Sequence, residues 1–152
     1  MNILVPVLVV LASTLFMEFM AWFTHKYIMH GFLWVLHKDH HTGEHHPFQW
    51  NDIFALIFVV PSVILIILGL PEFSYPFFIG IGIALYGLTY FLLHDVLVHR
   101  RLKILDTIDN KYFRAIVKAH NDHHIGRKNY GFILMIPWKY FRSVGKAERG
   151  KY

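Results

Sequence analysis

Ten of the twelve histidines in this chain fall into two blocks that repeat one spacing, H-x4-H followed by H-x2-H-H. The members are His25, His30, His37, His40 and His41 in the first block and His94, His99, His120, His123 and His124 in the second. Neutral imidazole is the commonest protein ligand for first-row transition metals, and one zinc ion usually takes three or four protein ligands. Ten such groups therefore predict two metal ions.

The two halves of each block differ in what a helix can do with them. In H-x2-H-H, positions i, i+3 and i+4 share one helix face, so each triplet can direct three imidazoles into one pocket. In H-x4-H, an ideal α-helix separates the two residues by about 140°. Each such pair therefore straddles two ions, or the helix is distorted at that point.

Acidic residues recur inside the motifs and are candidates for supporting the histidines. Metal-bound imidazole usually donates its other N–H to a carboxylate or a carbonyl. We expect this role for Asp95, and also for Asp39 and Asp122, for which a solvated helix surface is the alternative. Glu18 lies two helical turns before His25 within an apolar run, where a carboxylate is a functional candidate. It could be a ligand, an outer acceptor or a helix-packing residue.

Composition places the chain in a membrane. Its 152 residues, the length of one domain, are 55% hydrophobic, 17% aromatic and only 16% charged. Cysteine is absent, which excludes disulfides, thiolate nucleophiles and cysteine-ligated iron–sulfur clusters. Electrons for any redox chemistry must come from a partner or a bound cofactor.

Three apolar runs are long enough to be membrane helices: Ile3 to Phe23, Ile53 to Leu70 and Phe77 to Leu93. The last two flank residues 71–76, whose two prolines interrupt helical pairing and predict a hairpin. The glycines Gly80, Gly82 and Gly87 in the third run indicate close helix packing. The predicted fold is an all-α integral membrane helical bundle with three to four membrane-embedded helices.

The distribution of basic residues predicts the topology. All 15 Lys and Arg residues lie within 24–52 or 94–152, so the positive-inside rule places both histidine blocks and the C-terminus in the cytosol. Residues 106–119 have the spacing of an interfacial helix, and residues 130–141 are expected to dip into the interface or close over the site. We expect membrane lipid as a partner and no nucleic acid.

The motifs resemble those of the membrane fatty acid hydroxylase superfamily of histidine-rich di-iron oxygenases. Within it, HKYIMHGFLWVLHKDHH, FQWND, HDVLVHRR, AHNDHH and YGFIL look like the bacterial β-carotene 3-hydroxylases. The similarity runs from about Met20 to Leu134. Val96 departs from the glycine that such enzymes often carry in HDGLVH, which bears on pocket shape more than on reaction class.

The resemblance implies a single membrane-bound hydroxylase domain over residues 1–152, in the bacterial inner membrane. It implies insertion of one oxygen atom from O2 at C3 of the β-ionone rings of β-carotene, giving β-cryptoxanthin and then zeaxanthin. The ten block histidines would be the metal ligands for two iron ions, although purified protein could carry zinc. The carotenoid would enter from the bilayer, and a ferredoxin-type donor would supply electrons.

Three alternatives remain open at this point. A related membrane di-iron oxygenase could act on a fatty acyl chain or a sterol, and a carotenoid ketolase could carry the same motifs. A membrane metal transporter is the alternative outside enzymes. A transporter needs ionisable residues along a path through the bilayer, whereas only Glu18 lies within a predicted span.

Overall fold

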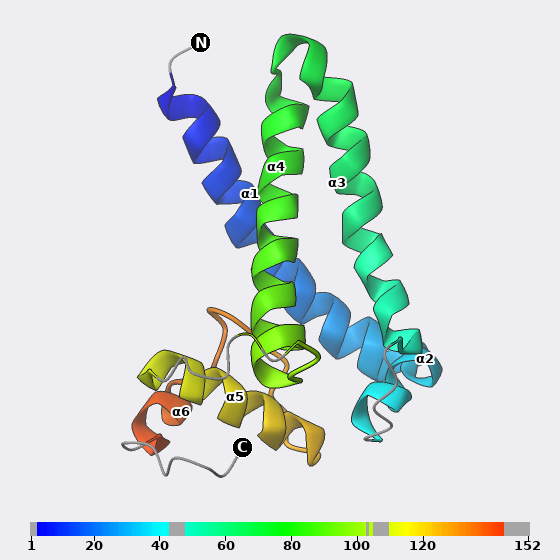
Figure 1. Ribbon diagram of the computed structural model, residues 1–152, viewed down its shortest axis with the longest axis vertical. Helices are drawn as coiled ribbons and strands as arrows, with labels where there is room; N and C mark the ends of the chain where they lie inside the picture. Colours follow the sequence, from blue (N-terminus) through cyan, green and yellow to red (C-terminus); the bar gives the residue numbers. More distant parts are fainter. Residues whose placement is uncertain (1–2, 43–47, 103, 105–109, 145–152) are drawn as a thin grey trace. The chain divides into compact units, whose positions relative to one another are not determined.

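The computed structural model describes residues 3–42, 48–102, 104 and 110–144, and among these residues it contains helices and no β-strand (Figure 1). Three helices in this described part are long and apolar enough to cross a membrane. They span Leu4–Phe32, Trp50–Glu72 and Tyr75–Val98. The prediction of an all-α membrane bundle is confirmed.

The chain divides into two compact units, residues 1–90 and 91–152, so the single domain expected over 1–152 stays a prediction. The helices of the first unit are α1 (Leu4–Phe23), η1 (Thr24–Phe32), α2 (Trp34–His41), η2 (Trp50–Ala55), α3 (Leu56–Gly69), η3 (Leu70–Glu72) and α4 (Tyr75–Tyr90). Those of the second unit are η4 (Phe91–Val98), α5 (Lys111–His124) and α6 (Trp138–Ser143).

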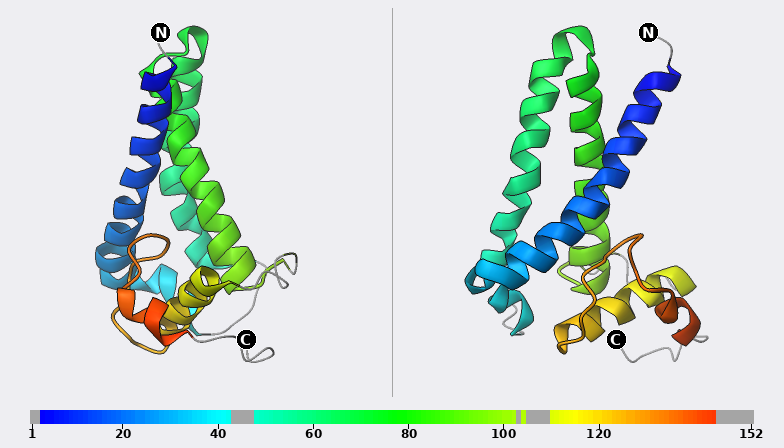
Figure 2. Two further views of the ribbon diagram at one scale, coloured as in Figure 1. Left: turned by 90° about the vertical axis from the view of Figure 1, so that its left-hand side faces the viewer. Right: turned by 180° about the vertical axis from the view of Figure 1, so that it is seen from behind.

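In the first unit, α4 packs against both α1 and α3, and the α3–α4 hairpin is plain from behind (Figure 2). Two glycines of α4 permit this close packing. A Cβ at Gly80 would lie 2.8 Å from the Ser62 carbonyl of α3, and one at Gly82 would lie 2.6 Å from Ser13 Cβ of α1. The expected packing role is confirmed for these two glycines, but a Cβ at Gly87 would meet no atom within 4 Å.

A buried polar pair also joins α1 to α4. The Tyr86 hydroxyl donates to Glu18 Oε2 at 2.9 Å, and the two side chains are only 5% and 4% exposed. Glu18 therefore bonds to a residue of the neighbouring helix within the membrane-spanning part of the chain. Of the roles open to it, helix packing has this direct contact in its favour.

In the second unit, α5 packs against α6 and η4. Asn110 caps α5 by accepting a hydrogen bond from Phe113 N at 3.0 Å, and Gly126, with φ of 88°, follows the end of the helix. The interfacial helix expected over 106–119 thus begins at Lys111, and residues 106–109 lie outside the described part.

Candidate metal centres

The first histidine block gathers four rings in the first unit. Nitrogen atoms of these rings all lie within 4.8 Å of one another, and they belong to His25 and His30 of η1 and to His37 and His41 of α2. The His37 ring centroid lies 4.8 Å from those of both His30 and His41. We call these four residues the first cluster, and His37 is its central member.

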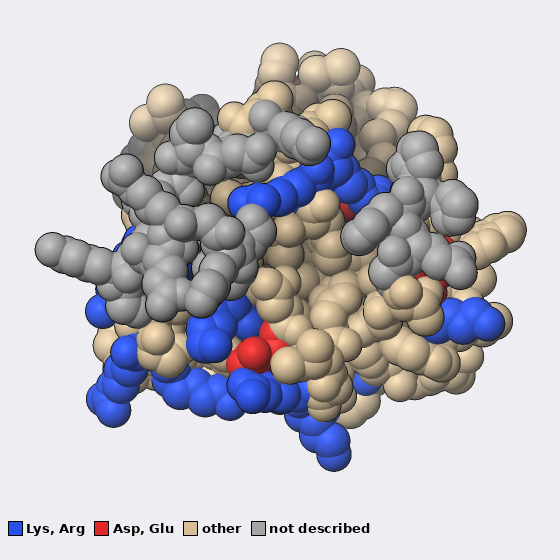
Figure 3. Space-filling view, turned by 60° about the horizontal axis from the view of Figure 1, so that its bottom comes forward, with Lys and Arg blue, Asp and Glu red and all other residues tan. Residues whose placement is uncertain are grey.

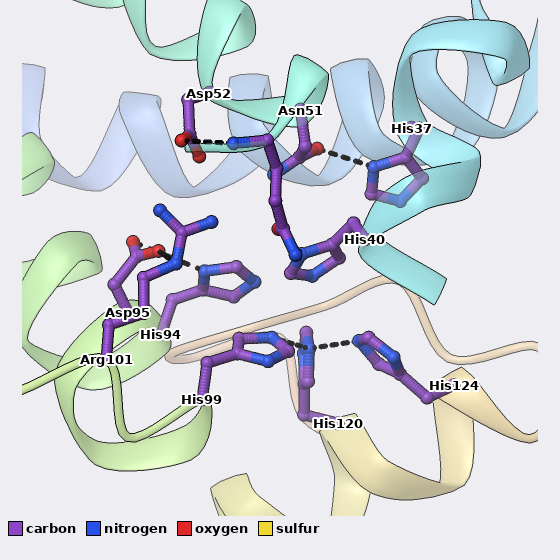
Figure 4. A network of polar contacts seen from close by, with 11 residues as sticks. His37, His40, Asn51, Asp52, His94, Asp95, His99, Arg101, His120 and His124 are labelled. Carbon is purple, nitrogen blue, oxygen red and sulfur yellow. Dashed lines mark hydrogen bonds and ion pairs between the residues drawn. The ribbon is translucent and has the colours of Figure 1, made fainter. Parts of the chain in front are cut away.

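The second histidine block forms a matching group in the second unit. Nitrogen atoms of His94 in η4, of His99 directly after η4 and of His120 in α5 lie within 4.8 Å of one another. His120 Nε2 also lies 2.9 Å from His99 Nε2 and 2.7 Å from His124 Nε2 (Figure 4). We call these four residues the second cluster, with His120 at its centre.

Both H-x4-H pairs lie on π-helical turns, which removes the obstacle that an ideal α-helix presents. A π-helix bonds residue i to residue i+5, so the two histidines share a face. His99 N donates to His94 O at 2.9 Å, and the two ring centroids are 4.6 Å apart. In η1 the centroids of His25 and His30 are 4.9 Å apart. The helix is distorted here, and each pair converges.

The fifth histidine of each block lies beside its cluster. His40 is 4% exposed, and its ring stacks on that of His37 with centroids 5.3 Å apart. His123 is also 4% exposed, and its centroid lies 6.0 Å from that of His120 and 5.4 Å from that of Tyr130. All ten block histidines are therefore gathered with other members of their own block. His45 and His46 lie outside the described residues.

In the first cluster, the distance between two ring nitrogens fits a shared cation. His37 Nε2 and His41 Nε2 are 3.1 Å apart. Two nitrogens bound to one zinc ion at about 2.1 Å, separated by 90° to 110°, lie about 3.0 to 3.4 Å apart. His120 Nε2 carries one proton or one lone pair, so it cannot form good hydrogen bonds with both neighbouring nitrogens at once. A metal ion would satisfy all of these lone pairs, so the residues present fit one.

Two side-chain amides from the start of the second membrane helix support the first block. His37 Nδ1 lies 2.6 Å from Asn51 Oδ1 (Figure 4). His40 Nδ1 lies 3.1 Å from Gln49 Oε1. An amide oxygen can only accept, so Nδ1 of each ring carries the proton and Nε2 presents its lone pair. Sequence reasoning missed both amides, although FQWND was among the motifs that carried the resemblance.

A carboxylate supports the second cluster. Asp95 Oδ2 lies 3.4 Å from His94 Nδ1, and Asp95 Oδ1 pairs with Arg101 Nε at 3.2 Å. The contact to the imidazole is long, and the guanidinium offsets part of the carboxylate charge. Asp95 thus lies beside the Nδ1 atom of His94, as expected for a carboxylate that accepts the second N–H of a metal-bound imidazole.

The other two acidic candidates have different contacts from those expected. Asp39 accepts hydrogen bonds from the backbone N–H groups of His40 at 2.8 Å and Trp50 at 2.6 Å. Asp122 pairs with Arg127 at 2.5 Å. Burial and then the Asp122 carboxylate raise the pKa of Tyr140 above its ordinary value of 10.0. Asp39 organises backbone, and Asp122 takes part in a charge pair at the end of α5.

Aromatic side chains cover part of each cluster. Phe132, which is 6% exposed, meets His94 and His120 edge-on with centroids 5.2 and 5.5 Å away. Phe54 meets His37 edge-on at 6.4 Å. The segment expected to close over the site thus contributes Phe132.

The three apolar helices and the two compact histidine clusters together indicate a helical membrane protein of a metal-binding class. The fatty acid hydroxylase family model matches residues 10–142 of this chain. The chain belongs to the fatty acid hydroxylase family.

Several known proteins are similar to this chain over most of its length. It is 39% identical over 136 residues to a β-carotene hydroxylase from a Paracoccus species, covering 86% of this chain and 84% of that one. It is 40% identical over 130 residues to a β-carotene hydroxylase from Pseudescherichia vulneris, covering 86% and 74%. A β-carotene hydroxylase from Pantoea ananas is 34% identical over 148 residues, covering 94% and 85%. No solved structure matches the chain.

Proposed function

We propose that this chain is a di-iron monooxygenase that hydroxylates C3 of the β-ionone rings of β-carotene, forming β-cryptoxanthin and then zeaxanthin. The observation that carries the proposal is the convergence of imidazole nitrogens in both clusters, in a chain whose bacterial relatives are named β-carotene hydroxylases. The balanced reaction takes one C–H bond, one O2, two electrons and two protons, and yields one C–OH group and one water.

The ten block histidines are the proposed ligands for two iron ions. When bound, iron supplies the reduction of O2 and the oxidation of an unactivated C–H bond. Asn51, Gln49 and Asp95 each face an Nδ1 atom, which would fix the tautomer in which Nε2 of the same ring presents its lone pair. Phe132 and Phe54 pack edge-on against histidine rings of the clusters.

The substrate is proposed to enter from the bilayer. β-Carotene is about as long as the hydrocarbon core is thick, roughly 30 Å. One ring can therefore reach a site at the membrane surface while the polyene lies along the helices. Hydroxylation of the second ring then requires release and reversal of the molecule.

Electrons are proposed to come from a ferredoxin-type protein that docks on the cytosolic face, with the protein in the bacterial inner membrane. Exposed Lys and Arg side chains are prominent on the face shown in Figure 3. Lys128 and Lys139 are exposed, whereas Arg101 already pairs with Asp95. We expect Lys128→Glu with Lys139→Glu to raise the KM for reduced ferredoxin at low salt without changing metal content. An unchanged KM, insensitive to salt, would remove the docking proposal.

Expression in a bacterium that accumulates β-carotene tests the reaction, with pigments identified by chromatography and mass. The expected products are heavier than β-carotene by one and by two oxygen atoms and carry no carbonyl group. Variants His40→Ala and His123→Ala should insert into the membrane and form no product. Unchanged β-carotene with iron-loaded, reduced protein present would favour the fatty acyl substrate that the family description suggests. A carbonyl product would indicate a ketolase.

A further inference from the structure

The residues at the cytosolic-facing start of the predicted second span do more than begin a membrane helix. Gln49, Asn51 and Asp52 belong to one short stretch around the first turn of η2. Gln49 and Asn51 each present an amide oxygen to a different histidine of the H-x2-H-H triplet of α2. Gln49 and Asn51 are two residues apart in sequence, and the histidines that they contact, His40 and His37, are three residues apart on α2. The two amides therefore support the same triplet side by side.

Backbone hydrogen bonds fix this stretch against α2. Asp52 Oδ2 accepts from Gln49 N at 3.0 Å, which ties the two ends of the turn together. Asp39 of α2 accepts from Trp50 N at 2.6 Å and from His40 N at 2.8 Å, so one carboxylate joins the turn to the helix that carries the histidines. The amides are therefore held in place by two further side chains.

We infer that Asn51 and Gln49 are positioning residues for metal binding by the first block: their amide oxygens hold the Nδ1 protons of His37 and His40 and so direct both Nε2 lone pairs toward an ion. This inference rests on the proposed function, because it assumes that these histidines bind metal. Asn51 is 8% exposed and His37 is 1% exposed, so little water is present to replace the amide. The Asn51 contact is also the shorter of the two, at 2.6 Å against 3.1 Å.

The choice of amide over carboxylate has a chemical consequence. A carboxylate draws the Nδ1 proton toward itself and makes the imidazole a stronger electron donor to its metal, whereas a neutral amide does so less. Asn51→Asp should therefore preserve metal binding while making the bound iron harder to reduce. Asn51→Leu removes the acceptor at similar volume and should weaken binding.

The test measures zinc affinity of the full-length protein in detergent by competition with a chromophoric chelator. Wild type should bind two zinc ions per chain, and Asn51→Leu should bind one of them about 10- to 100-fold more weakly. Asn51→Asp should retain both, and its iron-loaded form should show a lower midpoint potential than wild type. Ser62→Ala is the matched control, because it removes a buried hydrogen bond of α3, Ser62 Oγ to the Gly80 carbonyl at 2.8 Å, away from the η2 turn.

Gln49→Met repeats the test through His40 and keeps it decisive if Asn51→Leu does not fold. We expect a smaller loss of zinc affinity than for Asn51→Leu, and Gln49→Glu should restore wild-type affinity. Folded Leu and Met variants that both bind two zinc ions as tightly as wild type would overturn the inference and leave the proposed function intact. Wild type that binds no zinc and no iron would overturn both.

Discussion

The two histidine clusters have the same ligand order but different supports. In each, a π-helical turn brings an H-x4-H pair together and an α-helix adds the H-x2-H-H triplet. The first block is held by two neutral amides, and the second by a carboxylate that also pairs with a guanidinium. The repeated spacing therefore accounts for which ring nitrogens come together, whereas the groups that contact the Nδ1 atoms of these rings come from residues that are not repeated.

Removing the central histidine of either cluster is the largest perturbation. His37→Ala and His120→Ala each delete a ring that contacts the other three of its cluster. We expect both variants to form no hydroxylated carotenoid, because each cluster then lacks one of its proposed metal ligands. Product analysis in the carotene-accumulating host, alongside metal content of the purified protein, measures this. Wild-type turnover in one variant would mean that its cluster serves no catalytic metal.

Substitution of Asp95 tests whether the different supports matter. Asp95→Leu removes the acceptor from His94 and should weaken zinc binding about 10- to 100-fold. Asp95→Asn leaves an acceptor oxygen and makes the support resemble that of the first block, so its loss should be smaller. Chelator competition on both proteins gives the ratio. Equal losses would show that Asp95 acts through Arg101 and not through the imidazole.

The aromatic covers offer a finer comparison. Phe132 contacts two histidines of the second cluster and Phe54 contacts one of the first. Edge-on aromatic pairs contribute about 0.5 to 1.5 kcal/mol beyond their burial. Phe132→Leu should therefore lower the free energy of unfolding by about 1 kcal/mol more than Phe54→Leu. Reversible denaturant unfolding in detergent measures both, and a larger loss for Phe54→Leu would contradict the expected order.

Hydropathy predicted the membrane helices, and the histidine spacing predicted that the rings of each block gather together. The apolar run that ends at Phe23 marks where hydrophobicity stops, but the backbone stays helical through His30 and kinks at Gly31, whose φ and ψ are -102° and -124°. Amino-acid composition does not predict the π-helical turns. The repeated H-x4-H spacing does indicate them, because residues i and i+5 share a face only when the helix widens. Asn51 was missed because it lies fourteen residues from His37 in the sequence, and no local pattern specifies a contact at that separation.

The smallest effect is expected at the polar pair in the membrane-spanning part of the first unit. Tyr86→Phe and Glu18→Gln each disturb one interhelical hydrogen bond, and such bonds in membrane helices average about 0.6 kcal/mol. We expect each variant to lower the free energy of unfolding by about 0.6 kcal/mol. The double variant should lose no more than the sum of the two single losses. A double-mutant cycle of unfolding in detergent gives the coupling free energy between the two side chains.

Zinc affinity of the same variants tests the role of Glu18. If Glu18 only packs helices, zinc affinity stays at the wild-type value in all three proteins. A loss of zinc affinity in Glu18→Gln that Tyr86→Phe does not share would instead place the carboxylate in the metal site, because the two variants break the same bond.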